Sequence, residues 1–287
     1  MKIGLLDIDG HNFPNLALMK ISAYHKSMGD SVEFATMFEH YDIIYKSKIF
    51  TYSIDPEYCY HTNKEIIGGT GYDIKSKLPE EIDKQCPDYS LYNCQYAYGF
   101  LTRGCIRKCP ECFVPEKEGS ISAYMDIDDF IGDYNSAILM DNNVLSIEHG
   151  IKQIEKIIKK KIKIDFNQGL DARLIDDSIA KLLSRMKWLE PLRLACDSIA
   201  MIEPVRKSVE LLRWHNCTPS TYFVYVLVKD INDAMDRIKF LKGIHLDPFA
   251  QPFRNKNGDE PTEEQKRFCR WVNHKAIFKS VEWENYC

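Results

Sequence analysis

Between residues 96 and 255 the chain alternates short apolar runs with amphipathic stretches, and this alternation limits its fold more than any other feature. The apolar runs are rich in β-branched and aromatic residues, as buried strands are, and the stretches between them place apolar residues at helical spacing. Ile147, Ile151, Ile154 and Ile158, for example, fall on one helix face. The expected strands are residues 96–102, 136–143, 162–168, 191–198, 221–228 and 247–253.

This pattern gives about six strand–helix pairs. Strands joined through helices lie parallel with right-handed crossovers, so the predicted class is α/β. Six such units suit an incomplete version of the eight-fold barrel. We therefore expect a partial (β/α)6 TIM-like barrel over residues 96–255, followed by a C-terminal helical segment over residues 256–287.

A smaller unit precedes the barrel. Residues 3–9 read as a buried strand, and the helical pattern that follows ends near Gly29. Further strand patterns lie at residues 31–38, 41–50 and 65–72. These features predict a small Rossmann-like α/β unit over residues 1–77, joined to the barrel by a proline-containing linker over residues 78–95.

Composition narrows the class of protein. The formal net charge of −4 gives no support for a nucleic-acid partner, although a local basic patch is compatible with it. The start, MKIGLLDIDG, lacks the apolar core of a signal peptide, and no run of about 18 apolar residues follows. We therefore expect no membrane association and a cytoplasmic location. In a reducing compartment, clustered thiols among the ten cysteines favour metal binding over disulfides.

Three cysteines, Cys105, Cys109 and Cys112, follow the first expected barrel strand with C-x3-C-x2-C spacing. A structural zinc site would need a fourth ligand, for which Cys94 is the nearest spare thiol. Packing as small hydrophobic residues is disfavoured because charged residues flank all three. Three thiolates on one loop can instead hold three corners of a 4Fe-4S cluster and leave the fourth iron open to another ligand.

In this spacing and place the loop resembles the radical S-adenosylmethionine superfamily, over residues 96–255. The resemblance implies a 4Fe-4S cluster on the three cysteines, with S-adenosylmethionine on the open iron. Reductive cleavage would give a 5′-deoxyadenosyl radical that abstracts hydrogen from a substrate, here unidentified. It also implies an electron donor such as a flavodoxin or ferredoxin.

One position departs from that family's pattern. The family commonly has an aromatic residue directly before the third cysteine, whereas Glu111 stands there in this chain. The aromatic packing beside the adenine would then have to come from Phe113, Tyr98 or Phe100.

Polar residues recur at the carboxyl ends of the expected strands, where α/β barrels place their chemistry. Singly, each is as compatible with a turn or a helix cap as with a ligand. Their recurrence makes them candidate cofactor-binding residues: Asp141, Asn142, Asn143, Gln168, Asp171, Arg173 and Asp197.

The resemblance suggests roles for some of them. The family holds the methionine amino group of the cofactor at the end of the second strand, where Asp141 to Asn143 lie. Asp171 and Arg173 are expected either to pair across a turn or to bind the cofactor carboxylate, and Asp197 suits ribose hydroxyls. In the last segment, Arg254 is a candidate contact for an anionic substrate.

The N-terminal unit resembles the arrangement of cobalamin-dependent members of the superfamily, in a truncated form. Asp7, Asp9 and His11, or the glycines Gly68, Gly69 and Gly71, are in position to touch a ligand, but an ordinary loop and glycine turn are the preferred interpretation.

Three hypotheses remain open. The first is a radical S-adenosylmethionine enzyme, the second a cobalamin-assisted radical methyltransferase, and the third a non-catalytic iron–sulfur or zinc-binding module.

Overall fold

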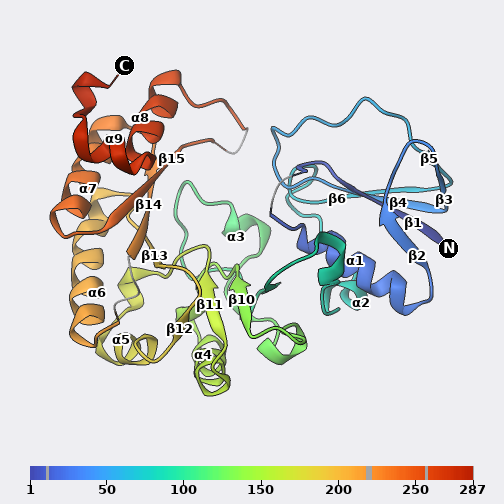
Figure 1. Cartoon of the computed structure of the whole chain (residues 1–287), viewed down its shortest axis with the longest axis horizontal. Coiled ribbons are helices and arrows are strands. Elements are labelled where there is room, and N and C mark those ends of the chain that lie inside the picture. The colour runs from blue at the N-terminus through green and yellow to red at the C-terminus, as the bar shows by residue number, and fades with distance from the viewer. Residues whose placement is uncertain (11–12, 218–221, 256–257, 287) are drawn as a thin grey trace.

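The computed structural model describes residues 1–10, 13–217, 222–255 and 258–286. The chain forms a mixed α/β structure with parallel sheets, which confirms the predicted class. A smaller N-terminal unit and a larger unit stand side by side, and the cysteine segment lies between them (Figure 1). No described helix is long and apolar enough to cross a membrane.

The N-terminal unit is built on a parallel sheet in the order β2-β1-β4-β6. The chain runs from β1 to one neighbour and then returns to its other side, so a topological switch point lies at the carboxyl ends of β1 and β4. Helix α1 (Leu16–Ser27) begins at Asn15, whose side chain accepts from the Leu18 N–H. The strands are β1 (Lys2–Asp7), β2 (Ser31–Phe34), β4 (Ile43–Ser47) and β6 (Glu65–Gly68), with a separate pair β3 (His40–Tyr41) and β5 (His61–Thr62).

The larger unit contains two parallel sheets, β12-β11-β10-β7 and β13-β14-β15. A single parallel bridge between Leu170 and Leu194 links them. Among the described residues the strand pairing ends at β7 on one side and at β15 on the other, so no closed barrel forms. The strands are β7 (Ala97–Gly99), β10 (Ser136–Leu139), β11 (Lys163–Phe166), β12 (Lys187–Trp188), β13 (Leu192–Ala195), β14 (Tyr222–Val228) and β15 (Asp247–Pro252).

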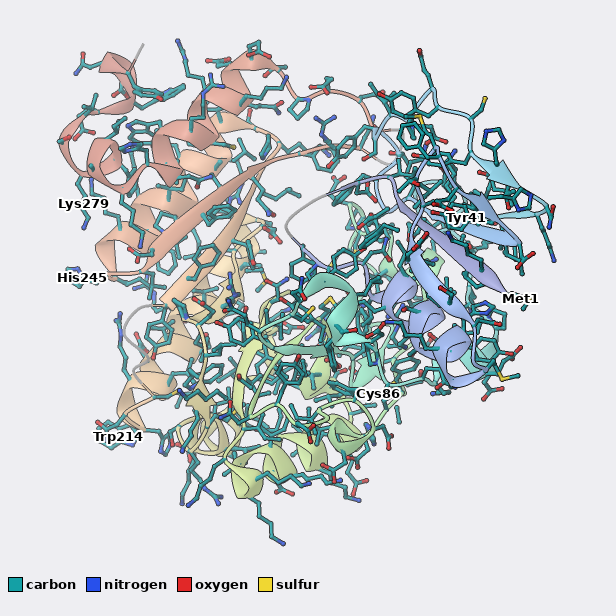
Figure 2. The ribbon with its side chains drawn as sticks, turned by 45° about the vertical axis from the view of Figure 1, so that its right-hand side comes forward. Met1, Tyr41, Cys86, Trp214, His245 and Lys279 are labelled. Carbon is teal, nitrogen blue, oxygen red and sulfur yellow. The ribbon has the colours of Figure 1, made fainter. Side chains whose placement is uncertain are left out.

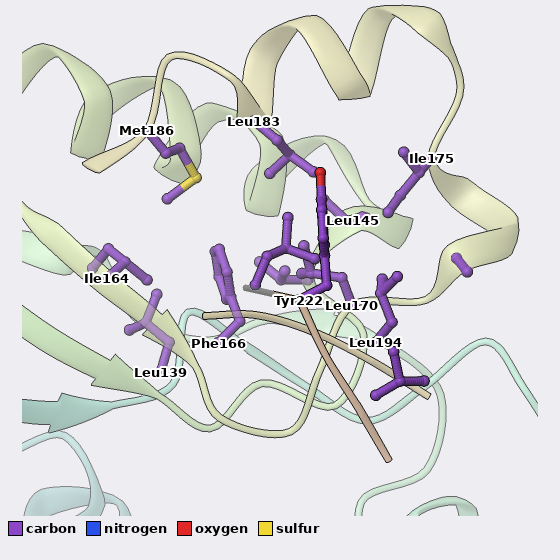
Figure 3. Packing of buried hydrophobic residues seen from close by; sticks show 14 of the residues in the cluster. Leu139, Leu145, Ile164, Phe166, Leu170, Ile175, Leu183, Met186, Leu194 and Tyr222 are labelled. Atoms are coloured by element: carbon purple, nitrogen blue, oxygen red, sulfur yellow. The ribbon is translucent and has the colours of Figure 1, made fainter. Parts of the chain in front are cut away.

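Helices cover the outer side of these sheets (Figure 1). Their apolar faces and the sheets share one core, part of which is seen in Figure 3, where Leu139, Ile164 and Phe166 of the strands lie near Leu183 and Met186. The helices are α4 (Glu148–Lys160), α5 (Asp177–Leu183), α6 (Ile202–Trp214), α7 (Ile231–Gly243), α8 (Glu263–Asn273) and α9 (Lys275–Ser280). The 3-10 turns are η1 (Tyr89–Tyr92), η2 (Ile127–Asp129), η3 (Val144–Ser146), η4 (Ala172–Leu174), η5 (Ile199–Met201) and η6 (Trp283–Asn285).

Several helices and strands have boundaries that differ from the expected ones. The strand expected over residues 96–102 splits into β7 and β8 (Thr102–Arg103), because β8 pairs with the antiparallel strand β9 (Ser122–Ala123) instead of continuing the sheet. Between the strands expected over residues 162–168 and 191–198, helix α5 ends at Leu183 and Lys187 starts an additional short strand, β12, beside β11. The linker over residues 78–95 is partly helical, with α2 (Glu80–Asp83) and η1.

The two units are joined through buried polar contacts. Lys20 of α1 is 3% exposed and donates to the Tyr124 hydroxyl at 2.8 Å and to Asp83. Tyr92 donates to Asp7 at the end of β1 at 2.6 Å. Cys86 lies at this junction, between α1 and the larger unit (Figure 2). These contacts fix the carboxyl edge of the N-terminal sheet against the larger unit.

Candidate functional site

The cysteine segment is a loop closed at its base. β8 and β9 pair where the loop leaves and returns, and the Cys105 N–H donates to the Gly119 carbonyl at 3.3 Å. Gly104 adopts φ +83°, and a Cβ there would lie 2.4 Å from the Ser120 carbonyl oxygen. Only glycine allows both this backbone conformation and this close approach. The chain therefore reaches Cys105 through a tight turn that is held by this hydrogen bond.

Glu118, at the end of α3 (Val114–Lys117), fastens this base. Its carboxylate accepts from the Gly104 N–H at 2.7 Å and from Asn142 Nδ2 at 2.9 Å, and it pairs with Arg103 at 2.7 Å. The Glu118 side chain is 11% exposed, so these charge-assisted bonds are shielded from water. One carboxylate therefore joins both ends of the cysteine loop to the end of β10.

The sulfurs of two cysteines accept backbone hydrogen bonds. The Arg107 N–H donates to Cys105 Sγ at 3.3 Å and the Val114 N–H to Cys112 Sγ at 3.4 Å. Cys105 and Cys112 are half-buried and Cys109 is exposed. Donors of this kind stabilise thiolates and tune iron–sulfur centres. Among the described residues, no three His, Cys, Asp or Glu side chains form a group able to hold a single metal ion.

Asp171 connects the cysteine loop to the ends of β10 and β11. Its carboxylate accepts from Arg107 Nε at 2.9 Å, from Arg173 Nε at 2.7 Å and from Asn143 Nδ2 at 3.2 Å. Burial alone would raise the pKa of Asp171, but the hydrogen bonds from Arg173 and Arg107 hold that pKa below its usual value. Arg173 also contacts the Cys109 thiol. The two arginines bring more positive charge to the thiols than Asp171 neutralises.

Asn143 carries the least satisfied polar group of this region. Its Nδ2 lies 3.5 Å from Cys105 Sγ, whereas its buried Oδ1 has no hydrogen-bond partner among the described residues. The whole residue is 3% exposed. A buried acceptor without a donor costs free energy, so a ligand donor at this position would stabilise the site.

Asp141 and Asp197, two of the predicted cofactor residues, accept hydrogen bonds from backbone N–H groups. Both Asp141 oxygens accept from the Leu101 N–H at 3.1 Å, and one accepts from the Thr102 N–H and hydroxyl at 2.6 Å. Burial raises the pKa of Asp141 to about 6, against the opposing effect of these hydrogen bonds. Asp197 accepts from the Leu227 N–H at 2.9 Å. Their contacts hold the strand ends in place.

Gln168 and Arg254 are the remaining predicted residues. Gln168 is exposed in the turn after β11. Arg254 stacks on Tyr52 of the N-terminal unit, 4.2 Å from the ring centre, and pairs with Glu260 at 3.0 Å. The predicted site residues that the structure brings together are Cys105, Cys109, Asn143, Asp171 and Arg173, with Asn142 beside them on Glu118.

Glu111, at the position where the resemblance calls for an aromatic residue, pairs with Lys229 beyond β14 at 2.5 Å. Phe113 is 50% exposed, whereas Tyr98 is buried against Phe13. Cys94 precedes β7 and Cys105 follows it, so the spare thiol lies at the opposite end of that strand from the loop.

The described N-terminal candidates contact neighbouring segments of the chain. Asp9 is buried and accepts from the loop after β4, and Gly69 at φ +103° would clash with the Lys48 carbonyl if it had a Cβ. His11 lies outside the described residues. The contacts of Asp9 and Gly69 agree with the interpretation of these motifs as an ordinary loop and a glycine turn.

Arg107 and Glu118 are site residues that the sequence reasoning missed. Arg107 lies between two of the cysteines, so its position alone marked it as a neighbour of the thiols. Glu118 comes directly before Gly119, which ends the loop. This position is a weaker signal than that of Arg107, because a glutamate followed by a glycine is also common at an exposed helix end.

A comparison with protein-family models finds no matching family, and a search of curated proteins finds no significant match.

Proposed function

We propose that this protein is a radical S-adenosylmethionine enzyme whose loop at Cys105, Cys109 and Cys112 holds a 4Fe-4S cluster. The observation that carries the proposal is the buried Oδ1 of Asn143, which has no hydrogen-bond partner in the described part of the chain, on a side chain that also donates to Cys105. The three thiols could bind the cluster, and the buried amide oxygen beside them could accept a hydrogen bond from the amino group of a ligand on the open iron.

The donor set fits a cluster better than a single ion. A structural zinc site needs four ligands that converge on one point, and Cys94 lies beyond β7 from the loop. The described residues contain no such converging group. In a 4Fe-4S cluster each thiolate binds a different iron, so three cysteines on one loop can hold it without converging on a single point. The backbone N–H groups that donate to Cys105 and Cys112 would stabilise such thiolates.

We further propose that the larger unit is the partial barrel of this class. Supporting this, β7, β10 and β11 are parallel neighbours in one sheet, which β12 extends beyond β11, and β13, β14 and β15 are parallel neighbours in the other, with the Leu170–Leu194 bridge between the two sheets. Cys105, Asn143 and Asp171 then lie beyond the carboxyl ends of the first strands, where α/β barrels carry their chemistry.

When bound, the cluster and S-adenosylmethionine would supply reductive cleavage and hydrogen abstraction. The chain's own residues would bind and orient. Asn143 Oδ1 would accept a hydrogen bond from the cofactor ammonium, and Arg107 and Arg173 would supply positive charge for its carboxylate. Glu118 fixes the loop that carries the thiols.

Iron and acid-labile sulfide analysis after anaerobic reconstitution tests this proposal. We expect about four of each per chain, and loss of both when the three loop cysteines are replaced by Ala. Cys59→Ala and Cys217→Ala are matched controls, since one thiol is exposed and the other buried away from the loop, and both should keep full iron.

Full iron in the triple variant would refute the assignment. A single zinc and no sulfide would favour the metal-binding module. A corrinoid absorption spectrum in purified protein would favour the cobalamin-assisted methyltransferase.

A further inference from the structure

The two faces of the N-terminal sheet are covered in different ways. Helix α1 packs on one face, where Leu18 lies in a buried cluster with Ile3 and Leu5 of β1. The other face lies under the chain between β4 and β6, residues 48–64, which contains the two-residue strand β5 and no helix (Figure 1). Parallel sheets usually have helices on both faces, so this second face is unusual in being covered by an irregular segment.

A pocket of about 320 Å³ lies between this second face and the segment that covers it. Its floor is apolar, since Leu6 and Ile44 of the sheet are 8% and 1% exposed, and the segment adds Pro56 and Cys59. This volume is at the lower end of the range for ligand sites and equals about ten times the share of one water molecule in the liquid. The pocket therefore suits a small organic molecule better than a single ion.

Lys46 brings a positive charge to the pocket. Its ammonium forms an ion pair with Asp55 at 2.7 Å, and its side chain is 15% exposed. The same carboxylate binds Lys48 at 2.9 Å and accepts from the Tyr72 hydroxyl at 2.7 Å. Two ammonium groups thus share one carboxylate. An ammonium has three N–H donors, so Lys46 can bind a second anionic group, one that enters the pocket.

Glu65 brings a negative charge to the same pocket. It begins β6 and lies opposite Ile44 in the register of β4 and β6, so strand geometry places its Cα roughly 8 Å from that of Lys46. Its side chain is exposed and forms no ion pair with another residue in the described part of the chain. The pocket therefore combines an apolar floor with one charge of each sign.

We propose that this pocket binds a free amino acid with an apolar side chain. The carboxylate of the amino acid would lie against Lys46, its ammonium against Glu65 and its side chain on the apolar floor. A zwitterion matches both charges, whereas an inorganic anion would use Lys46 and leave Glu65 and the floor without contacts. The site belongs to the N-terminal unit and does not depend on the proposed function.

Isothermal titration calorimetry of the full chain with L-phenylalanine tests this proposal. Two analogues each lack one charge: 2-phenylethylamine has no carboxylate, and 3-phenylpropionate has no ammonium. We expect L-phenylalanine to bind more tightly than either analogue. L-alanine keeps both charges but leaves the apolar floor uncovered, so it should also bind more weakly.

Four variants test the residues. Lys46→Gln should weaken L-phenylalanine roughly 10-fold or more, because the ammonium is mostly buried. Glu65→Gln should weaken it about 2- to 5-fold, because an exposed ion pair contributes less. Glu57→Gln and Lys64→Gln change exposed neighbours that do not line the pocket, so both should bind like wild type. Circular dichroism confirms that each variant is folded.

Alkylation of Cys59 shows where the ligand binds, because this exposed thiol lines the pocket. Saturating L-phenylalanine should slow the reaction of Cys59 with iodoacetamide and leave the reaction of Cys86, an exposed thiol that does not line the pocket, unchanged. Peptide mass spectrometry measures both rates.

The inference is overturned if wild type does not bind L-phenylalanine, if either analogue binds as tightly, if both charge variants bind like wild type, or if the ligand leaves Cys59 alkylation unchanged. Binding that is lost when Cys105, Cys109 and Cys112 are replaced by Ala, but is unaffected by Lys46→Gln, would place the amino acid at the cysteine loop and would also contradict it. None of these measurements requires an assembled cluster, so a failure of the proposed function would leave the pocket site standing.

Discussion

The side-chain nitrogen of Asn143 lies 3.5 Å from the sulfur of Cys105, and the oxygen of the same amide is buried without a partner in the described part of the chain. One amide therefore touches the thiol loop and offers an acceptor beside it. This relationship links the cysteine motif to the end of β10, which is where the proposed cofactor would lie.

Replacing Asn143 tests that link. Asn143→Ala removes the acceptor and should weaken S-adenosylmethionine binding by roughly 5- to 150-fold, since a lost hydrogen bond to a charged group costs on the order of 1 to 3 kcal/mol. Iron content should stay at the wild-type level. Equilibrium dialysis against the reconstituted protein measures the affinity, with Asn63→Ala, an exposed asparagine of the N-terminal unit, as control. Equal affinity in all three proteins would exclude Asn143 from the site.

The sequence predicted the strand–helix order well, because apolar periodicity reports burial directly. It predicted Asn143, Asp171 and Arg173 as strand-end groups, and the structure brings them together. It did not reveal that Asp141 accepts a hydrogen bond from the Thr102 N–H, because an aspartate at a strand end gives the same sequence pattern whether it binds a ligand or the backbone of a loop.

The shortest elements also escaped prediction. β8 and β9 have two residues each and exist through their antiparallel pairing across the cysteine loop, a contact between distant segments that local pattern does not encode. Glu118 was missed for the same reason, since its three partners come from the loop base and from the residue after Asp141.

The Glu118 carboxylate should stabilise the loop measurably. Glu118→Gln keeps the side chain's size but loses the charge that Arg103 and Gly104 bind, so the free energy of unfolding should fall by about 1 to 3 kcal/mol. Iron should also leave faster when a chelator is added. Glu155→Gln, on an exposed position of α4, should change stability by less than about 0.5 kcal/mol. Urea unfolding that gives the same value for both variants would remove Glu118 from this role.

Gly104 and Gly119 form a matched pair for testing the loop base. Both have positive φ, +83° and +76°, so Ala should cost about 1 to 2 kcal/mol of backbone strain at each. Only at Gly104 would the new Cβ also meet the Ser120 carbonyl, at 2.4 Å, whereas nothing lies within 4 Å at Gly119. Gly104→Ala should therefore be the more destabilising in urea unfolding. The reverse order would contradict the described turn.

Asp141 should give stability a specific pH dependence. Its pKa is about 6 when folded and 3.8 when exposed, so the folded state binds the proton more tightly. Its contribution to the free energy of unfolding should decrease as pH rises from about 4 to about 6, by up to about 3 kcal/mol. Urea unfolding of wild type and Asp141→Asn across this range isolates the contribution of Asp141 to the free energy of unfolding, because the other carboxylates are common to both proteins. A difference between the two proteins that does not change with pH would refute it.

Product analysis after reduction tests the central claim most directly. Reconstituted protein is incubated anaerobically with S-adenosylmethionine and dithionite, and 5′-deoxyadenosine and methionine are quantified by chromatography. We predict that wild type forms both slowly, and that the variant with Cys105, Cys109 and Cys112 replaced by Ala forms neither. Wild type that retains four irons yet forms no 5′-deoxyadenosine would contradict the account and leave a metal-binding module in its place.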